Sequence, residues 1–138
     1  MSPGEQRALT VVILDKDPWG RRQLAARLSR EPGIRVVGEG PVDGGGVRMV
    51  QQAQPDVVLV ESKTGDEHGI EVVRTLAQRA PETAVIVLTS FFDQEEQEAV
   101  LRAGATAYSL KELDARRLVD LIRRSARSRC STSPDQGR

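Results

Sequence analysis

The chain has 138 residues, and its 20 basic and 20 acidic side chains leave a formal net charge of zero. This length predicts one domain with a sizeable core, and the charge balance favours neither nucleic acid nor a membrane surface as a direct partner. The single cysteine, Cys130, excludes an internal disulfide framework. No apolar run approaches the ~20 residues of a membrane span, and residues 1–8 lack the apolar core of a signal peptide. We therefore expect a cytoplasmic location and no contact with a membrane.

Aliphatic runs alternate with helical patterns along the chain. Strands are predicted where consecutive aliphatic residues indicate burial on both faces, at residues 9–14, 34–37, 55–61, 84–89 and 105–110. Helices are predicted where apolar residues recur at helical spacing, at residues 18–31, 47–53, 70–80, 93–103 and from 114 onward. Parallel strands need crossover helices. The alternation therefore predicts an α/β fold, a doubly wound (βα)5 flavodoxin-like three-layer sandwich with a parallel sheet in the order 2-1-3-4-5.

Local signals mark the helix ends and the limits of the domain. Asp17 precedes Pro18, so we interpret Asp17 as a helix cap rather than a metal ligand, and Asp93 with Glu96 forms a variant of the capping box. Residues 38–46 hold five glycines but lack the lysine-serine/threonine ending of a phosphate-binding loop, which favours a flexible loop. We expect a disordered N-terminus at 1–8, a domain at 9–126 and a disordered tail at 127–138.

Residues with distinctive chemistry follow the predicted strands. Glu61 ends the third strand, at the sheet edge where function collects in parallel α/β folds. The chain has only three lysines, each just after the first, third or fifth strand: Lys16, Lys63 and Lys111. Its four aromatic residues map to the same end: Trp19, Phe91, Phe92 and Tyr108. The sequence therefore predicts that one pole of the sheet carries the function.

Several ordered motifs then give the chain a family resemblance. They lie at residues 13–18, 36–39, 55–61, 69–71, 87–89 and 103–112. In this order and at this spacing, over residues 9–126, they resemble the receiver domain of two-component response regulators. The glutamate that follows Lys111, where many receivers have a proline, favours the NarL/FixJ type.

The resemblance implies roles for individual residues. In the family an aspartate on the third strand accepts a phosphoryl group, and an acidic pair after the first strand helps it to hold Mg²⁺. Glu61 falls on the acceptor, Asp15 matches the first acidic position and Lys16 falls on the second. Lys111 matches the lysine that contacts the phosphoryl group. The hydroxyl of Thr89 and the aromatic ring of Tyr108 match the switch pair.

The two departures change the chemistry that we expect. The ammonium groups of Lys16, Lys63 and Lys111 outnumber the carboxylates of Asp15 and Glu61, and Asp17 only brings the balance to zero. Mg²⁺ needs oxygen ligands and one or two carboxylates, so neither Mg²⁺ nor any other metal or cofactor is expected. Glutamate also carries its carboxylate roughly 1.5 Å further out, and reaction geometry is sensitive to such a displacement.

Two interpretations of Glu61 stay open. Its charge either mimics a phosphorylated aspartate, by reaching toward Lys111 and Thr89, or it seals the former site through an ion pair with Lys16, Lys63 or Lys111. The aromatic candidates, Trp19, Phe91 and Phe92, either plug the phosphorylation pocket or form a small-molecule or partner site. We favour the plug, because nothing in the sequence specifies the polar groups of a ligand.

The surface charges predict a homodimer. Glu95 and Glu98 on the fourth helix are acidic, whereas Arg116, Arg117 and Arg123 on the fifth are basic, which suits a two-fold interface. The function expected is an atypical, phosphorylation-independent receiver, without enzymatic activity, from a transcription regulator that contacts DNA only through an effector domain absent from this chain. The alternatives are a stand-alone protein adaptor, a small-molecule sensor and a conventional phosphoryl-accepting receiver.

Overall fold

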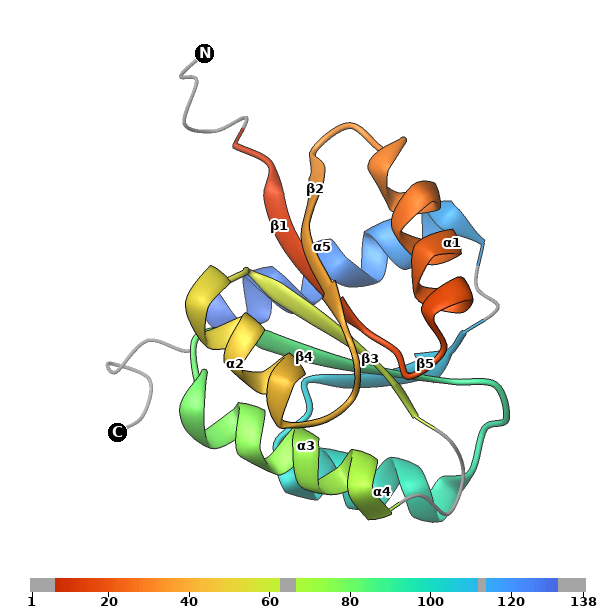
Figure 1. Ribbon diagram of the computed structural model, residues 1–138, viewed down its shortest axis with the longest axis vertical. Helices are drawn as coiled ribbons and strands as arrows, with labels where there is room; N and C mark the ends of the chain where they lie inside the picture. Colours follow the sequence, from red (N-terminus) through yellow and green to blue (C-terminus); the bar gives the residue numbers. More distant parts are fainter. Residues whose placement is uncertain (1–6, 63–66, 112–113, 132–138) are drawn as a thin grey trace.

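A parallel sheet forms the centre of the molecule (Figure 1). The computed structural model describes residues 7–62, 67–111 and 114–131, and within them five strands are arranged in the order β2-β1-β3-β4-β5. The strands are β1 (Leu9–Leu14), β2 (Ile34–Gly40), β3 (Val57–Ser62), β4 (Ala84–Thr89) and β5 (Ala107–Leu110). The helices are α1 (Pro18–Ser29), α2 (Gly44–Ala53), α3 (Glu67–Arg79), α4 (Gln94–Ala103) and α5 (Ala115–Ser131). The predicted doubly wound α/β fold and its strand order are confirmed.

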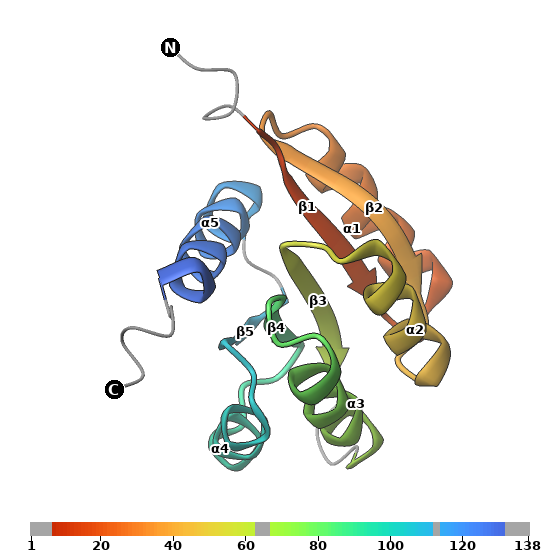
Figure 2. The ribbon, with the colours of Figure 1, turned by 90° about the vertical axis from the view of Figure 1, so that its left-hand side faces the viewer.

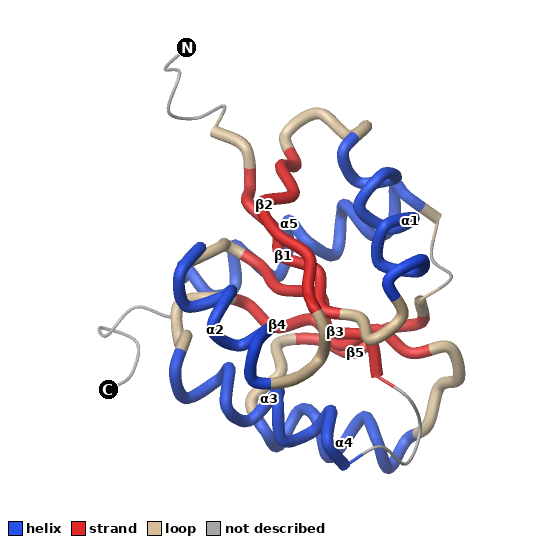
Figure 3. Tube along the Cα trace, in the orientation of Figure 1, coloured by secondary structure: helices blue, strands red, loops and turns tan. Residues whose placement is uncertain are grey.

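Helices cover both faces of the sheet and give three layers (Figures 2 and 3). The alternation of side chains along each strand divides the core in two. On one face Val11, Ile13 and Leu59 pack against α1 and α5, and on the other Val12, Val58 and Val60 pack against α2, α3 and α4. Both faces are therefore aliphatic, which is why the strands read as continuous apolar runs.

The glycine-rich segment differs from its prediction as a flexible loop. Strand β2 runs on to Gly40, and α2 already begins at Gly44. The Asp43 side chain accepts hydrogen bonds from the backbone N–H groups of Gly45 and Gly46, and this cap stabilises a helix start that glycine alone disfavours. A Cβ on Gly46 would lie 2.2 Å from the carbonyl oxygen of Pro41. Glycine is required there by close packing.

The ends of the domain also differ from expectation. Helix α5 continues to Ser131, so residues 127–131, which we expected in a disordered tail, are helical. The rest of that tail and the first six residues lie outside the described residues. No helix in the described part of the chain is long and apolar enough to cross a bilayer.

The three central strands are tied together at the end opposite the predicted site. The backbone N–H and the hydroxyl of Thr10 both donate to the Asp56 carboxylate, at 2.9 and 3.1 Å, and the Asp56 N–H donates to the Thr10 hydroxyl at 3.0 Å. On the other side the buried Thr83 hydroxyl donates to the Pro55 carbonyl oxygen at 2.8 Å. These side chains hold the starts of β1 and β4 against the segment that leads into β3.

Candidate functional site

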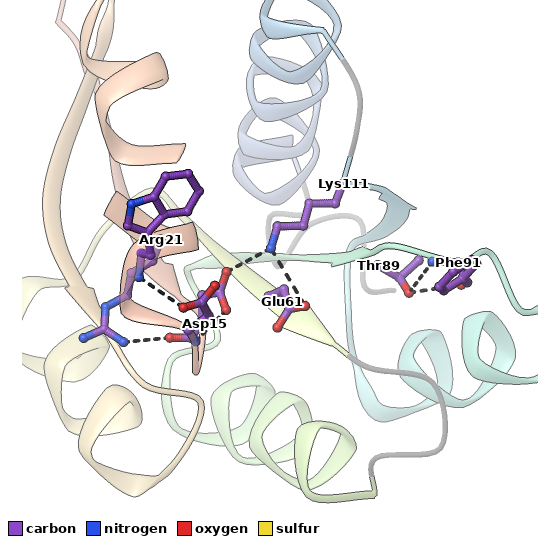
Figure 4. Close-up of polar contacts among 8 residues, drawn as sticks. Asp15, Arg21, Glu61, Thr89, Phe91 and Lys111 are labelled. Atoms are coloured by element: carbon purple, nitrogen blue, oxygen red, sulfur yellow. Dashed lines mark hydrogen bonds and ion pairs between the residues drawn. The ribbon is translucent and has the colours of Figure 1, made fainter. Parts of the chain in front are cut away.

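Three charged side chains meet where β1, β3 and β5 end (Figure 4). Lys111 follows β5 and reaches between Asp15 and Glu61, with its Nζ 3.1 Å from Asp15 Oδ2 and 3.9 Å from Glu61 Oε2. Asp15 is buried and its side chain is only 2% exposed, whereas that of Lys111 is 27% exposed. Lys111 therefore lies over both carboxylates at this pole, and its contact with Asp15 is the shorter one.

One backbone group and one side chain near the start of α1 fix Asp15 in place. Its Oδ1 atom accepts a hydrogen bond from the Asp17 N–H at 3.0 Å, while Arg21 donates to its carbonyl oxygen at 2.7 Å. Asp17 itself accepts from the Trp19 N–H at 3.2 Å and caps α1, with Pro18 at the first helical position. The predicted cap at Asp17 is confirmed, and it orders the loop that carries Asp15.

Lys16, the other lysine among the described residues, does not belong to this cluster. The Lys16 side chain is exposed to solvent. It occupies the position of the family's second acidic residue but does not seal the site. Lys63 lies outside the described residues. Of the partners that we predicted for Glu61, the structure places Lys111 at ion-pair distance.

Thr89 is turned away from Glu61. Its hydroxyl donates to the Phe91 carbonyl oxygen at 3.0 Å and accepts from the Phe91 N–H at 3.3 Å, and Figure 4 shows this pair apart from the Asp15–Lys111–Glu61 cluster. The expectation that Glu61 reaches toward both Lys111 and Thr89 is therefore wrong for Thr89. The reason is strand alternation, because Thr89 falls on the sheet face of Val85 and Val87, covered by α2, α3 and α4.

A second polar cluster, which sequence reasoning missed, is buried on that face. Glu96 is 6% exposed, and its carboxylate accepts hydrogen bonds from the hydroxyls of Ser62 at 2.5 Å and Tyr108 at 2.6 Å. Burial, and next the hydrogen bond to Glu96, raises the pKa of the Tyr108 phenol above its ordinary value. The available signal was the acidic residue in the first turn of α4, which the capping-box interpretation had assigned to the helix itself.

One of the two hydrogen bonds of the predicted capping box is formed and the other is replaced. Asp93 caps α4 by accepting from the Glu95 N–H at 3.1 Å, as expected. The Asp93 N–H donates to the Tyr108 hydroxyl at 3.2 Å, so it does not donate to the Glu96 carboxylate as it would in a capping box. The Tyr108 phenol oxygen therefore links Asp93 and Glu96, the two members of the predicted capping box.

The other aromatic side chains lie on the surface. Trp19 is 70% exposed, Phe91 77% and Phe92 54%. A plug must be buried, so the expectation that these residues fill the phosphorylation pocket is wrong. Phe92 packs edge-to-face on Tyr108, with ring centroids 5.3 Å apart. The alternative that they form a ligand or partner site stays a prediction.

The charged residues predicted for a dimer are exposed on α4 and α5. They are Glu95, Glu98, Arg116, Arg117 and Arg123. Arg123 also donates to the Pro32 carbonyl oxygen at 3.2 Å, which directs it toward the end of α1. There the α5 arginines line a groove of about 740 Å³ beside Glu31 and Pro32.

The donor set at the pole suits a divalent cation poorly. Asp15 already uses Oδ1 for the Asp17 N–H and Oδ2 for Lys111. Within the described residues no three His, Cys, Asp or Glu side chains gather closely enough to hold a metal ion. An ammonium group and a backbone amide occupy the carboxylate that would bind Mg²⁺, so these residues do not fit that ion well.

The fold and this pole define a (βα)5 domain of the receiver architecture. The signal receiver domain of the putative response regulator NarL from Mycobacterium tuberculosis superposes with a TM-score of 0.78, at 23% identity over 88% of this chain and 98% of that one. A LuxR-family two-component response regulator from Aurantimonas sp. SI85-9A1 gives a TM-score of 0.79, at 24% identity over 88% of this chain and 86% of that one. Likeness at this identity shows the fold alone.

Sequence similarity then identifies the family. The response regulator receiver domain matches residues 11–123, and the chain belongs to this family. It is 34% identical over 119 residues to the transcriptional regulatory protein LiaR of Bacillus subtilis, covering 86% of this chain and 56% of that protein. It is 32% identical over 118 residues to DegU of Brevibacillus brevis, covering 86% and 50%. These relatives confirm the resemblance to the NarL/FixJ type, and the chain spans about half of their length.

Proposed function

We propose that this chain is an atypical receiver that works without phosphorylation, a pseudo-receiver, and that it regulates an effector domain. The observation that carries the proposal is the Lys111 contact with both Asp15 and Glu61. In an active receiver the lysine contacts the incoming phosphoryl group, whereas here a glutamate from β3 supplies a permanent negative charge beside it. The pole is thereby held in one state by its own side chains.

The absence of phosphotransfer chemistry is part of the same proposal. Lys16 replaces a carboxylate by an ammonium group at the position of a metal ligand, which removes an oxygen donor and adds a repelling charge. The carboxylate of Glu61 is the second obstacle, because its extra methylene moves the nucleophile by roughly 1.5 Å. We propose that the domain takes no Mg²⁺ or other cofactor and catalyses no reaction.

The effector output is inferred from the relatives. LiaR and DegU are named as transcriptional regulatory proteins, and each is about twice as long as the matched segment. We propose that this chain is the N-terminal regulatory domain of such a regulator, acting in the cytoplasm and reaching DNA only through an effector domain. Helix α5, which ends at Ser131, would then lead toward the effector domain.

Acetyl phosphate tests the proposal directly. After incubation with acetyl phosphate and Mg²⁺, the intact mass of the chain should stay unchanged. A gain of one phosphoryl group that hydroxylamine removes would contradict the proposal and would support a conventional receiver. The converse variant, Lys16→Asp with Glu61→Asp, should gain Mg²⁺ affinity and a labile phosphoryl group. Adding Asp15→Asn to that variant should abolish both, as a matched control.

We also propose that the domain associates with a second copy of itself. The exposed acidic residues Glu95 and Glu98 of α4 and the exposed basic residues Arg116 and Arg117 of α5 flank β5, the edge strand of the sheet. Leu110 on β5 is 42% exposed and supplies an apolar centre between the two charged helices. A two-fold axis along this edge would bring each charged helix against its opposite. We propose a homodimer that needs no phosphoryl group to form.

The exposed aromatic residues favour a second candidate, a receiver that docks a protein or small molecule. Phe91 and Phe92 are adjacent, and both rings lie more than half in solvent. A stand-alone adaptor or a ligand sensor would use such a surface. Screening for saturable changes in the fluorescence of Trp19, the only tryptophan, separates this candidate from the dimer, because a sensor should respond to a metabolite at fixed protein concentration.

A further inference from the structure

Glu96 is a buried carboxylate that the phosphorylation pole does not use. It lies in the first turn of α4 and is 6% exposed. Burying a carboxylate is costly unless hydrogen-bond donors replace the lost water. Ser62, which is 4% exposed, and Tyr108, which is 9% exposed, both donate their hydroxyls to it. These donors come from the end of β3 and from β5, so one carboxylate joins three elements.

The Tyr108 hydroxyl is also part of the start of α4. It accepts from the backbone N–H of Asp93, the N-cap residue, while it donates to Glu96 three residues later. In an ordinary capping box the acidic residue accepts directly from the N-cap amide. Here the phenol oxygen is inserted between them, so the ring cannot leave without releasing an amide at the helix start.

The chain of contacts then reaches the surface. The Tyr108 ring packs edge-to-face on Phe92, at an interplanar angle of 64°, and Phe92 is 54% exposed. Hydrogen bonds and one ring contact therefore connect Ser62 to an exposed aromatic side chain. Ser62 directly follows Glu61, whose side chain is at ion-pair distance from Lys111 on the pole.

We infer that Glu96 is a positioning residue that couples the carboxyl end of β3 to the surface formed by the β4–α4 loop and β5. The Ser62 hydroxyl orients the Glu96 carboxylate, and the carboxylate orients Tyr108, the start of α4 and Phe92. The Thr89 hydroxyl exchanges hydrogen bonds with the Phe91 backbone and also acts on the Tyr108 phenol. The coupling holds whether or not Glu61 is ever phosphorylated, so it does not rest on the proposed function.

Removing the Ser62 hydroxyl tests the coupling at a distance. In the 138-residue chain, amide hydrogen exchange of Asp93 measured by NMR should accelerate in Ser62→Ala by roughly five- to tenfold, the equivalent of one ordinary hydrogen bond. The Tyr108 and Phe92 ring signals should shift with it. Amides of α5 should keep their protection, because the change is local and not a general loss of stability.

Ser125→Ala is the matched control. Ser125 is also 4% exposed, but it lies in α5 on the other face of the sheet, so its removal should leave Asp93 exchange and both ring signals unchanged. Equal effects of the two serine variants at Asp93, or an unchanged Asp93 in Ser62→Ala, would overturn the inference.

Glu96→Gln shows whether the effect travels through the carboxylate. An amide keeps the shape but offers one oxygen acceptor instead of two, so Asp93 exchange should accelerate. In this background Ser62→Ala should have no further effect on Asp93, because the connecting group is already lost. Additive effects would contradict the coupling. If Glu96→Gln does not fold, the comparison of the two serine variants decides alone.

Discussion

Lys111 Nζ lies 3.1 Å from Asp15 Oδ2, although the two residues are 96 positions apart in the chain. The strands that precede them, β5 and β1, are separated in the sheet by β3 and β4, so the lysine side chain spans the carboxyl ends of the central strands. The contact thus joins the carboxyl ends of β1 and β5 at the pole where Glu61 lies.

Loss of this lysine should destabilise the domain. Lys111→Met leaves the buried Asp15 carboxylate without its cation, and we expect a loss of about 1.5–3 kcal/mol in the free energy of unfolding, typical of a hydrogen bond to a charged group. Lys16→Met is the matched control, because Lys16 is exposed and should change stability by less than about 0.5 kcal/mol. Urea unfolding measures both. Equal costs would show that the Lys111 contact has no stabilising effect.

The single tyrosine allows a direct titration. Burial first, and the hydrogen bond to Glu96 second, raise the pKa of Tyr108 above its ordinary value of 10.0. Absorbance at alkaline pH should therefore show the native phenol ionising at higher pH than in denaturant. Glu96→Gln should lower the native pKa only in part, because burial remains the larger cause. A native titration that coincides with the denatured one would contradict this prediction.

The same shift has a consequence for stability. In the pH interval between the ordinary pKa and the raised one, the folded state holds the phenol proton that the unfolded state has lost, so stability decreases as pH rises through this interval. Below pH 10 the contribution of Tyr108 is fully present. Tyr108→Phe should remove this part of the alkaline loss, and unfolding measured at a series of pH values for both proteins checks it.

The two neighbouring phenylalanines should behave differently. Phe92→Ala removes the edge-to-face contact with Tyr108 and should cost about 0.5–1.5 kcal/mol. Phe91 is 77% exposed, and Phe91→Ala should stay within about 0.5 kcal/mol of the parent chain. Melting temperatures of the two variants test the pair. A larger loss for Phe91→Ala would restore the plug that its exposure argues against.

The proposed dimer should depend on charge. Sedimentation should show association that weakens at high salt, because the Debye length shortens from ~8 Å at physiological ionic strength. Arg116→Glu with Arg117→Glu, and separately Leu110→Glu, should shift the chain toward monomer. Val37→Glu is the control, because Val37 is 38% exposed on β2, the opposite edge strand.

A monomer at every concentration up to the high-micromolar range would contradict the dimer. A dimer that is indifferent to salt and to the arginine changes would move the interface away from the edge at β5. The groove between α5 and Pro32, lined by Arg123, would then be the next surface to examine.

The strands and their order followed from the sequence because burial on both faces leaves an unbroken aliphatic run, as at Val57–Val60. The helix limits were less accurate where one side chain decides them. Asp43 caps a glycine-rich stretch and starts α2 at Gly44, whereas composition alone favoured a loop. Propensity describes single residues, and the cap is a contact between residues.

The sequence predicted which residues lie at the pole but not which of them contact one another. Asp15, Glu61 and Lys111 were expected together because each lies at the carboxyl end of a parallel strand. The separation of Thr89 from Glu61 depends on which sheet face each side chain takes, and the role of Glu96 depends on hydroxyls from Ser62 and Tyr108, 34 and 12 positions away. Sequence spacing within one helix could not show these long-range partners.

The hydrogen bonds among Thr10, Asp56 and their backbone amides have a consequence for how this lineage can change. They set the register of β1 against β3 at the end of the sheet farthest from Lys16, Glu61 and Lys111. These hydrogen bonds therefore hold the strands together at one end of the sheet, whereas the charged cluster lies at the other end. Charge reversals at the end that carries Lys16, Glu61 and Lys111 therefore need not shift the strands, so the chemistry of this pole can change while the fold is kept.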